Sequence, residues 1–139
     1  MTKPILTIVR GLPGSGKSSY ARKLAAETGA MLIEPDAMLV VGGEYVYTPK
    51  RYIEACKSAK YILKSAIAVK MDVIYADVLP TIESVNSIID VEAYQATIYT
   101  IRVIDMPLLT VEESIAHNRH NVRREDIERM AATWEPWDK

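Results

Sequence analysis

Short apolar runs alternate with longer amphipathic stretches along this chain. The apolar runs have the length of buried strands, and the last of them is rich in β-branched residues; they cover 5–10, 31–33, 73–76 and 97–104. The amphipathic stretches predict helices over 17–28, from Pro49, over 81–95, from Thr110 and from about Arg123. Strands that alternate with helices predict a mostly parallel sheet with helices on both faces, which is a three-layer α/β sandwich.

Local signals mark the ends of several helices. Gly29 suits the end of the first helix, because glycine readily adopts the left-handed conformation found there. Thr48 and Pro49 fit an N-cap followed by proline at the first helical position. Thr110 and Glu113 have the spacing of a capping box.

The apolar spacing also predicts which side of each helix is buried. For the first helix this side carries Tyr20, Leu24 and Thr28. For the second it carries Tyr52, Cys56, Ala59, Leu63 and Ala66. For the third helix this side carries Ile82, Val85 and Ile89. For the last helix it carries Ile127, Met130 and Trp134.

A glycine-rich motif joins the first strand to the first helix. Residues 11–18 read Gly-Leu-Pro-Gly-Ser-Gly-Lys-Ser, a complete P-loop in the strand–loop–helix context that the motif requires. Its glycines let backbone N–H groups surround a phosphate without Cβ clashes, and the helix points its positive end at the same anion. Lys17 is expected to reach the β- and γ-phosphates, and the Ser18 hydroxyl is expected to ligate Mg²⁺.

The sequence therefore predicts a P-loop NTPase fold that binds ATP and Mg²⁺. We expect the nucleotide to contact Gly11, Pro13, Gly14, Ser15, Gly16, Lys17, Ser18 and Ser19.

Carboxylates that follow strands are candidates for the chemistry, because ligands of parallel α/β sheets gather at the carboxyl ends of the strands. Asp77 ends the third apolar run and is expected to hold Mg²⁺ or to orient an acceptor; the alternative is an acid that caps the next helix. Asp36 follows Pro35 and could take a proton from a hydroxyl that attacks the γ-phosphate; the alternative is a turn or N-cap residue. Asp105 reads as a turn residue.

Composition fits one globular domain that spans 1–139. The chain is 49% hydrophobic and 25% charged, and its net charge of −1 gives no general attraction to nucleic acid or membrane. Its single cysteine, Cys56, cannot form an internal disulfide and fits a reducing compartment. No apolar stretch reaches the length of a membrane span or a signal-peptide core, so we expect a cytoplasmic protein.

Two features bear on a second substrate. Residues 50–70 carry six basic residues against Glu54, and Lys57, Lys60 and Lys64 fall on one helical stripe. This stripe is either a solvated helix face or a track for a polynucleotide backbone. Tyrosines are also close together in this region and either form a stacking platform for a base or pack against the sheet; they are Tyr45, Tyr47 and Tyr52.

Further stretches carry a resemblance to a known family. They are the P-loop, Glu-Pro-Asp at 34–36, Val-Gly-Gly-Glu-Tyr at 41–45, His-Asn-Arg-His-Asn-Val at 117–122, Ile-Glu-Arg-Met at 127–130 and Trp-Glu at 134–135. Together they resemble a small AAA-labelled P-loop family that is common in bacteriophages. That family is similar to the kinase domain of polynucleotide 5′-kinases and to zeta-toxin-type kinases.

The resemblance implies a C-terminal helical lid and roles for three residues. Asp36 matches the base toward a 5′-hydroxyl, Asp77 matches the acid after the third strand, and Arg119 lies in the lid that assists transfer. If the protein is phage-encoded, it would act in the host cytoplasm.

The chain departs from the family pattern in the lid. The pattern runs Arg-Asn-x-His-Gly-Val-Pro, whereas this chain has His117 for the arginine, Asn121 for the glycine and Arg123 for the proline. Which guanidinium reaches the phosphates is therefore open, and the candidates are Arg119, Arg123 and Arg124. Many relatives carry a histidine near Cys56, which we interpret here as a small core residue. His117 and His120 have no partner at metal-ligand spacing, so we expect no zinc site.

The expected function is ATP- and Mg²⁺-dependent phosphoryl transfer to a 5′-hydroxyl of a polynucleotide. A nucleoside, nucleotide or other small hydroxyl compound is the alternative acceptor. A non-enzymatic regulator that responds to ATP is the alternative outside the enzyme class. The sequence carries no signal for the oligomeric state.

Overall fold

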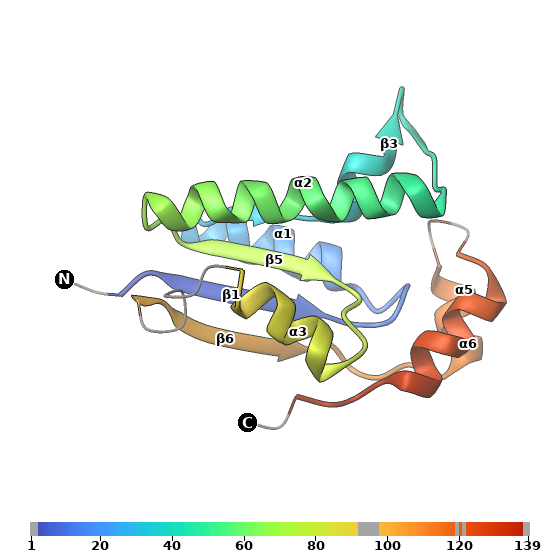
Figure 1. The fold of residues 1–139 in the computed structure, drawn as a ribbon. Coiled ribbons are helices and arrows are strands. Elements are labelled where there is room, and N and C mark those ends of the chain that lie inside the picture. Colours follow the sequence, from blue (N-terminus) through green and yellow to red (C-terminus); the bar gives the residue numbers. More distant parts are fainter. Residues whose placement is uncertain (1–2, 92–97, 119, 121, 138–139) are drawn as a thin grey trace.

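The computed structural model describes residues 3–91, 98–118, 120 and 122–137. Four parallel strands form the main sheet in the order β2–β5–β1–β6 (Figure 1). They are β1 (Ile5–Arg10), β2 (Met31–Ile33), β5 (Val73–Asp77) and β6 (Thr100–Asp105). Because all pairs are parallel, the carboxyl ends of these strands meet at one edge of the sheet.

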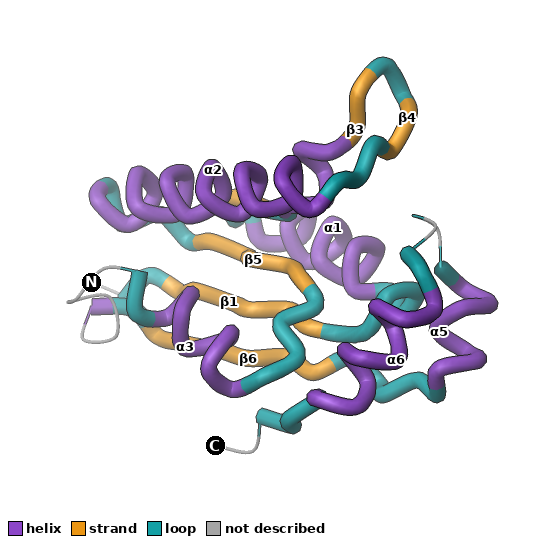
Figure 2. Tube along the Cα trace, turned by 45° about the vertical axis from the view of Figure 1, so that its right-hand side comes forward, coloured by secondary structure: helices purple, strands orange, loops and turns teal. Residues whose placement is uncertain are grey.

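Helices cover both faces of this sheet (Figures 1 and 2). They are α1 (Lys17–Thr28), α2 (Pro49–Ala68), α3 (Ile82–Ile89), α5 (Val111–His117) and α6 (Arg124–Thr133). The helix α1 lies on one face, α2 and α3 lie on the other, and α5 and α6 lie beyond the carboxyl ends of the strands. The predicted three-layer sandwich with a C-terminal helical lid is confirmed. No helix in the described ranges combines the length and apolar character needed to cross a membrane.

The central strand β1 explains why both faces must be covered. Leu6 and Ile8 are fully buried against the layer of α2 and α3, whereas Val9 is fully buried against α1. A parallel strand with both faces buried reads as a continuous apolar run, which is the pattern that predicted it.

Most predicted helix boundaries are confirmed. Gly29 ends α1 with φ 77°, and its N–H donates to the Ala25 carbonyl. The Thr48 hydroxyl accepts from the N–H of Arg51 at the start of α2. The capping box of Thr110 is also present at the start of α5.

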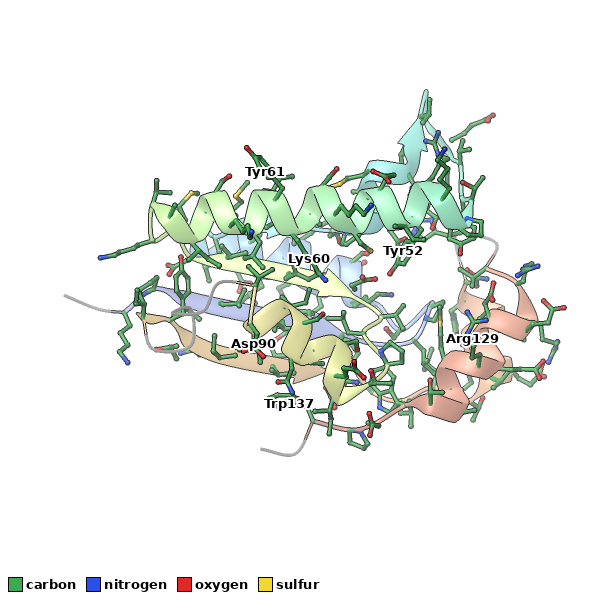
Figure 3. The ribbon with its side chains drawn as sticks, in the orientation of Figure 1. Tyr52, Lys60, Tyr61, Asp90, Arg129 and Trp137 are labelled. Atoms are coloured by element: carbon green, nitrogen blue, oxygen red, sulfur yellow. The ribbon has the colours of Figure 1, made fainter. Side chains whose placement is uncertain are left out.

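The predicted buried faces of α1 and α2 are partly wrong. Tyr20 is 40% exposed, and the small Ala21 is the residue of α1 that is buried against the sheet. Tyr52 and Cys56 are only half-buried; the buried stripe of α2 consists of Ala55, Ala59, Leu63, Ala66 and Ile67. Figure 3 shows Tyr61 on the outer side of α2 and Tyr52 on the side that faces the sheet.

Two predicted boundaries are also wrong. The helix α3 ends at Ile89 rather than at residue 95, because the chain turns at Asp90 and Val91 packs against the core. The strand β6 begins at Thr100 and continues through Asp105. Residues 92–97, which carry the remainder of both predictions, lie outside the described residues.

A small hairpin between β2 and α2 was not predicted. The 3₁₀ helix η1 (Pro35–Leu39) leads into β3 (Val40–Val41), which pairs antiparallel with β4 (Glu44–Tyr45). Its turn residues, Gly42 and Gly43, have φ of 58° and 84°, as a two-residue hairpin turn requires. The hairpin projects past the N-terminal end of α2 (Figure 1).

The last residue of β1 binds the C-terminal segment. The Arg10 side chain is fully buried, and its Nε and Nη2 donate to the Leu79 carbonyl at 3.0 and 2.7 Å. Its Nη1 donates to Asp105 at 3.2 Å, and the guanidinium lies 4.1 Å from the centroid of the Trp134 ring. Asp105 is therefore the last residue of a strand and the partner of a buried arginine, and its prediction as a turn residue is wrong.

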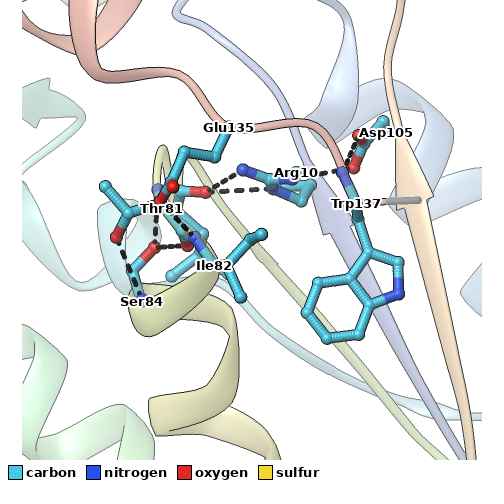
Figure 4. Close-up of polar contacts among 8 residues, drawn as sticks. Arg10, Thr81, Ile82, Ser84, Asp105, Glu135 and Trp137 are labelled. Atoms are coloured by element: carbon cyan, nitrogen blue, oxygen red, sulfur yellow. Dashed lines mark hydrogen bonds and ion pairs between the residues drawn. The ribbon is translucent and has the colours of Figure 1, made fainter. Parts of the chain in front are cut away.

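Polar contacts fix the rest of that segment to β6 and to the start of α3 (Figure 4). The N–H of Trp137 donates to Asp105 at 3.0 Å, and the N–H of Glu135 donates to the Pro80 carbonyl at 2.8 Å. The Glu135 carboxylate accepts from the N–H of Ile82 at 3.0 Å, at the start of α3. The chain after α6 is thus tied to the main body, which holds the lid over the carboxyl edge of the sheet.

Candidate functional site

A pocket of about 590 Å³ opens at the carboxyl edge of the sheet. Its walls come from the P-loop, η1, the hairpin, the first turn of α2, the end of β5 and the lid. This volume lies in the range of small-molecule and cofactor sites. The pocket therefore gathers the segments in which the sequence predicted site residues.

The P-loop has the conformation of an anion cradle. Gly14 and Gly16 have φ of 80° and 85°, which a side chain would strain. Gly16 is the N-cap of α1 and supplies no side-chain hydrogen bond, so the first N–H groups of the helix remain available for an anion. The Oγ of Ser15 is buried without a hydrogen-bond partner among the described residues. These features fit a bound phosphate.

Lys17 faces the candidate carboxylates. Burial lowers the pKa of its ammonium group, and the charges of Asp77, Asp36 and Glu34 oppose that shift. The structure therefore brings together the P-loop lysine and the two acids that follow β2 and β5, as the sequence predicted.

Asp77 is held by neighbouring donors at the end of β5. It is 4% exposed, and it accepts from the Tyr52 hydroxyl at 3.1 and 2.9 Å and from the N–H of Val78 at 2.8 Å. Burial, with the charge of Asp36, raises the pKa of its carboxyl to about 6. The alternative of a helix cap is wrong, because the side chain of Thr81 caps α3.

Asp36 lies in η1, the segment that follows β2. Its Oδ1 accepts from the Tyr45 hydroxyl at 3.0 Å, and the N-cap position of η1 belongs to Glu34. Asp36 is half-buried and lines the pocket, so it is available to a bound acceptor.

The three tyrosines line the pocket, and Tyr52 also contacts Asp77 at the end of β5. Tyr45 stacks on His120 of the lid with ring centroids 4.1 Å apart and planes at 26°. The ring centroids of Tyr47 and Tyr52 lie 6.1 Å apart, and the ring planes are at 47° to each other. All four side chains line the pocket.

The lid is in direct contact with the P-loop. The Ser114 hydroxyl of α5 donates to the Pro13 carbonyl at 2.5 Å. A Cβ added to Gly14 would lie 2.8 Å from the backbone of His117, so only glycine allows this approach. The sequence did not single out Ser114.

The lid arginines divide into two groups. Arg123 lines the pocket, whereas Arg124 pairs with Glu112 at 2.8 and 3.3 Å and is not part of the pocket wall. Arg119, the first candidate from the sequence, lies outside the described residues. Sequence reasoning missed Arg129 and Arg22, which line the pocket from α6 and α1.

The basic residues of α2 do not reach the pocket wall. Lys57 pairs with Glu54 at 3.5 Å on the exposed side of the helix. This favours the solvated helix face, and a polynucleotide track along the lysines stays a prediction.

The donor set near the P-loop fits Mg²⁺. The described residues contain no cluster of three or more His, Cys, Asp or Glu side chains arranged for a metal. Mg²⁺ is usually bound through one or two protein oxygens together with phosphates and water, so Ser18 and Asp77 would be sufficient. The pKa of Asp77 is raised by burial and, to a smaller extent, by repulsion from Asp36; a divalent cation here would offset that repulsion.

Comparison with solved structures shows which known folds this chain resembles. A chain of the Pnkp1/Rnl/Hen1 RNA repair complex matches 96% of this chain with a TM-score of 0.74 and 19% identity; the match covers 44% of that chain. A sugar kinase from Janibacter sp. HTCC2649 matches 97% of this chain at a TM-score of 0.68 and 15% identity, over 80% of its own length. An APS kinase from Mycobacterium tuberculosis matches 96% at a TM-score of 0.53 and 17% identity, over 98% of its length.

The fold is therefore that of the P-loop kinases. Residues 6–137 match the model of a family described as an AAA domain, and the chain belongs to that family. This chain spans less than half the length of the RNA repair protein that it resembles. No curated protein matches its sequence closely enough to count as a relative.

Proposed function

We propose that this protein transfers the γ-phosphate of ATP, with Mg²⁺, to the 5′-hydroxyl at the end of a single-stranded polynucleotide. The observation that carries the proposal is the placement of Asp36 and Asp77 around Lys17 in one tyrosine-lined pocket. A protein that only senses ATP has no need of a second carboxylate on the acceptor side of that lysine.

The residues divide the work between donor and acceptor. The P-loop N–H groups and Lys17 would hold the β- and γ-phosphates in line with the acceptor, and Ser18 and Asp77 would hold Mg²⁺, which neutralises developing charge when it is bound. The acceptor oxygen attacks the γ-phosphorus, the bond from that phosphorus to the β–γ bridging oxygen breaks, and ADP leaves. Asp36 would take the proton from the attacking hydroxyl.

The tyrosines favour an acceptor that carries a base. Flat aromatic side chains bind nucleotide bases by stacking, which is worth about 1–3 kcal/mol for each base. A nucleotide base stacked on Tyr45 would lie near the expected catalytic base, because the Tyr45 hydroxyl donates to Asp36. The likeness to a chain of an RNA repair complex points the same way.

A small hydroxyl compound is the second candidate acceptor. The likeness to a sugar kinase of similar length favours it, as does the absence of α2 lysines from the pocket wall. Incubation with γ-labelled ATP and single-stranded DNA, single-stranded RNA, nucleosides, nucleotides, sugars or water alone separates the candidates. Label in the polynucleotides alone supports the proposal, and label in a small acceptor alone replaces it.

Replacing Asp77 by asparagine tests whether its carboxylate holds the metal. In Asp77→Asn the side chain keeps its size and can still accept from Tyr52, but it loses the charge that attracts Mg²⁺. We expect about a tenfold increase in the Mg²⁺ concentration needed for half-maximal transfer, which corresponds to roughly 1.4 kcal/mol. The measurement is a Mg²⁺ titration of transfer at saturating ATP, and an unchanged midpoint would remove Asp77 from the metal site.

A further inference from the structure

A buried carboxylate sits between two exposed arginines on the pocket side of α6. Asp126, in the first turn of the helix, is only 7% exposed. Its Oδ2 lies 3.3 Å from Nε of Arg123, and its Oδ1 lies 3.0 Å from Nη1 of Arg129. The two arginine side chains are 73% and 66% exposed, and all three residues line the pocket.

We propose that Asp126 is a positioning residue, which holds Arg123 and Arg129 where both guanidinium groups meet the γ-phosphate of the bound nucleotide. This inference rests on the proposed binding of ATP, and it adds the residues by which the lid would distinguish a triphosphate from a diphosphate.

The geometry of a guanidinium allows one arginine side chain to bind Asp126 and a phosphate at the same time. Each guanidinium carries five N–H donors in a rigid plane, so a bond to Asp126 leaves donors for a phosphate. An exposed arginine without such a bond samples many rotamers, and ordering it when a ligand binds costs conformational entropy. Asp126 restricts that freedom in advance.

The location of α6 directs the pair at the phosphate end of the nucleotide. The neighbouring helix α5 contacts the P-loop through Ser114 on Pro13 and through His117 on Gly14. The helices α5 and α6 pack against each other (Figure 2), and α6 contributes Asp126 and Arg129 to the pocket wall. Arg129 extends from α6 within this lid (Figure 3). Arg124, one residue into the helix from Arg123, is turned instead to Glu112.

The direction in which Asp126→Asn changes the affinity for ATP distinguishes a positioning role from simple electrostatics. Asp126→Asn removes a negative charge from the pocket, and by Coulomb's law alone this would strengthen the binding of an anion such as ATP. A positioning role predicts the opposite result, because Arg129 loses the carboxylate that orders it and Arg123 is left with Glu125, whose Oε2 lies 4.0 Å from its Nε. Measuring the direction of the change therefore distinguishes the two explanations.

The experiment is calorimetric titration of ATP and of ADP, with Mg²⁺, into the whole protein and its variants. For Arg129→Ala we expect the affinity for ATP to fall about tenfold or more while the affinity for ADP changes little, since a hydrogen bond to a charged group is worth about 1.5–3 kcal/mol. For Asp126→Asn we expect a smaller fall in the same direction. Arg124→Ala is the matched control and should keep the wild-type ratio of ATP to ADP affinity.

Two results would overturn the inference. One is a wild-type ratio of ATP to ADP affinity in folded Asp126→Asn or in Arg129→Ala. If the KM of an acceptor rises in that variant instead, the arginines meet a phosphate of the acceptor. The other is tighter ATP binding in Asp126→Asn. Thermal unfolding confirms that each variant is folded, and Arg129→Ala keeps the test valid if Asp126→Asn is not. Because titration needs no acceptor, the outcome does not depend on whether the protein transfers phosphate to a polynucleotide.

Discussion

Replacing Lys17 by alanine is expected to lower phosphoryl transfer by about 10²-fold or more and to weaken ATP binding while the fold persists. The Lys17 ammonium is the side-chain charge built into the phosphate cradle of the P-loop, and it is aimed at the oxygens on which negative charge develops. Losing one such stabilising group usually lowers kcat by about 10²- to 10³-fold. The measurements are transfer from γ-labelled ATP and calorimetric titration of ATP.

The matched control for this variant lies on the same helix. Lys23 is exposed on α1 and is not part of the pocket wall, so Lys23→Ala removes the same charge from the same element. We expect it to keep wild-type ATP affinity and transfer. Unchanged ATP affinity in Lys17→Ala would contradict the nucleotide site at the P-loop.

Replacing Asp36 by asparagine is expected to lower transfer to the acceptor by about 10²-fold or more, which is within the usual contribution of general-base catalysis. Asparagine keeps the size of the side chain and can still accept from Tyr45, but it loses most of the basicity. ATP affinity should be nearly unchanged, because the expected contacts of Asp36 are with the acceptor. Single-turnover transfer and ATP titration measure the two effects separately.

A second aspartate provides the control for this change. Asp90 is exposed at the end of α3, away from the pocket, so Asp90→Asn makes the same chemical change outside the site (Figure 3). It should leave transfer unaffected. Full transfer activity in Asp36→Asn would remove the acceptor-side base and favour a nucleotide-dependent regulator.

The sequence predicted the parts of the fold that local signals determine. The apolar run of β1, the glycines of the P-loop and the caps at Gly29 and Thr48 each act within a few residues, so each could be identified without tertiary structure. The hairpin at 40–45 has a local signal too, since Gly42 and Gly43 suit its turn. Its strands are only two residues long, and such short elements carry little periodicity.

Contacts between distant residues could not be predicted in this way. Asp105 looked like a turn residue because its partner, Arg10, is 95 positions away in the sequence. Arg129 was not singled out from the sequence for a similar reason. Arg124 and Arg129 are the same residue type on the same helix. Their positions around α6 turn Arg124 toward Glu112 and Arg129 toward Asp126. The spacing of Asp126 and Arg129, three positions apart on a helix, was the available signal.

The central claim is that the acceptor is a polynucleotide 5′-hydroxyl, and a matched pair of substrates tests it most directly. The wild-type protein is incubated with γ-labelled ATP and Mg²⁺ and with one of two single-stranded oligonucleotides of identical sequence, one ending in a 5′-hydroxyl and the other in a 5′-phosphate. We expect label to accumulate in the first oligonucleotide, at its 5′ end, and not in the second. Equal labelling of the two, or labelling of neither while ATP binds normally, would contradict the proposed function.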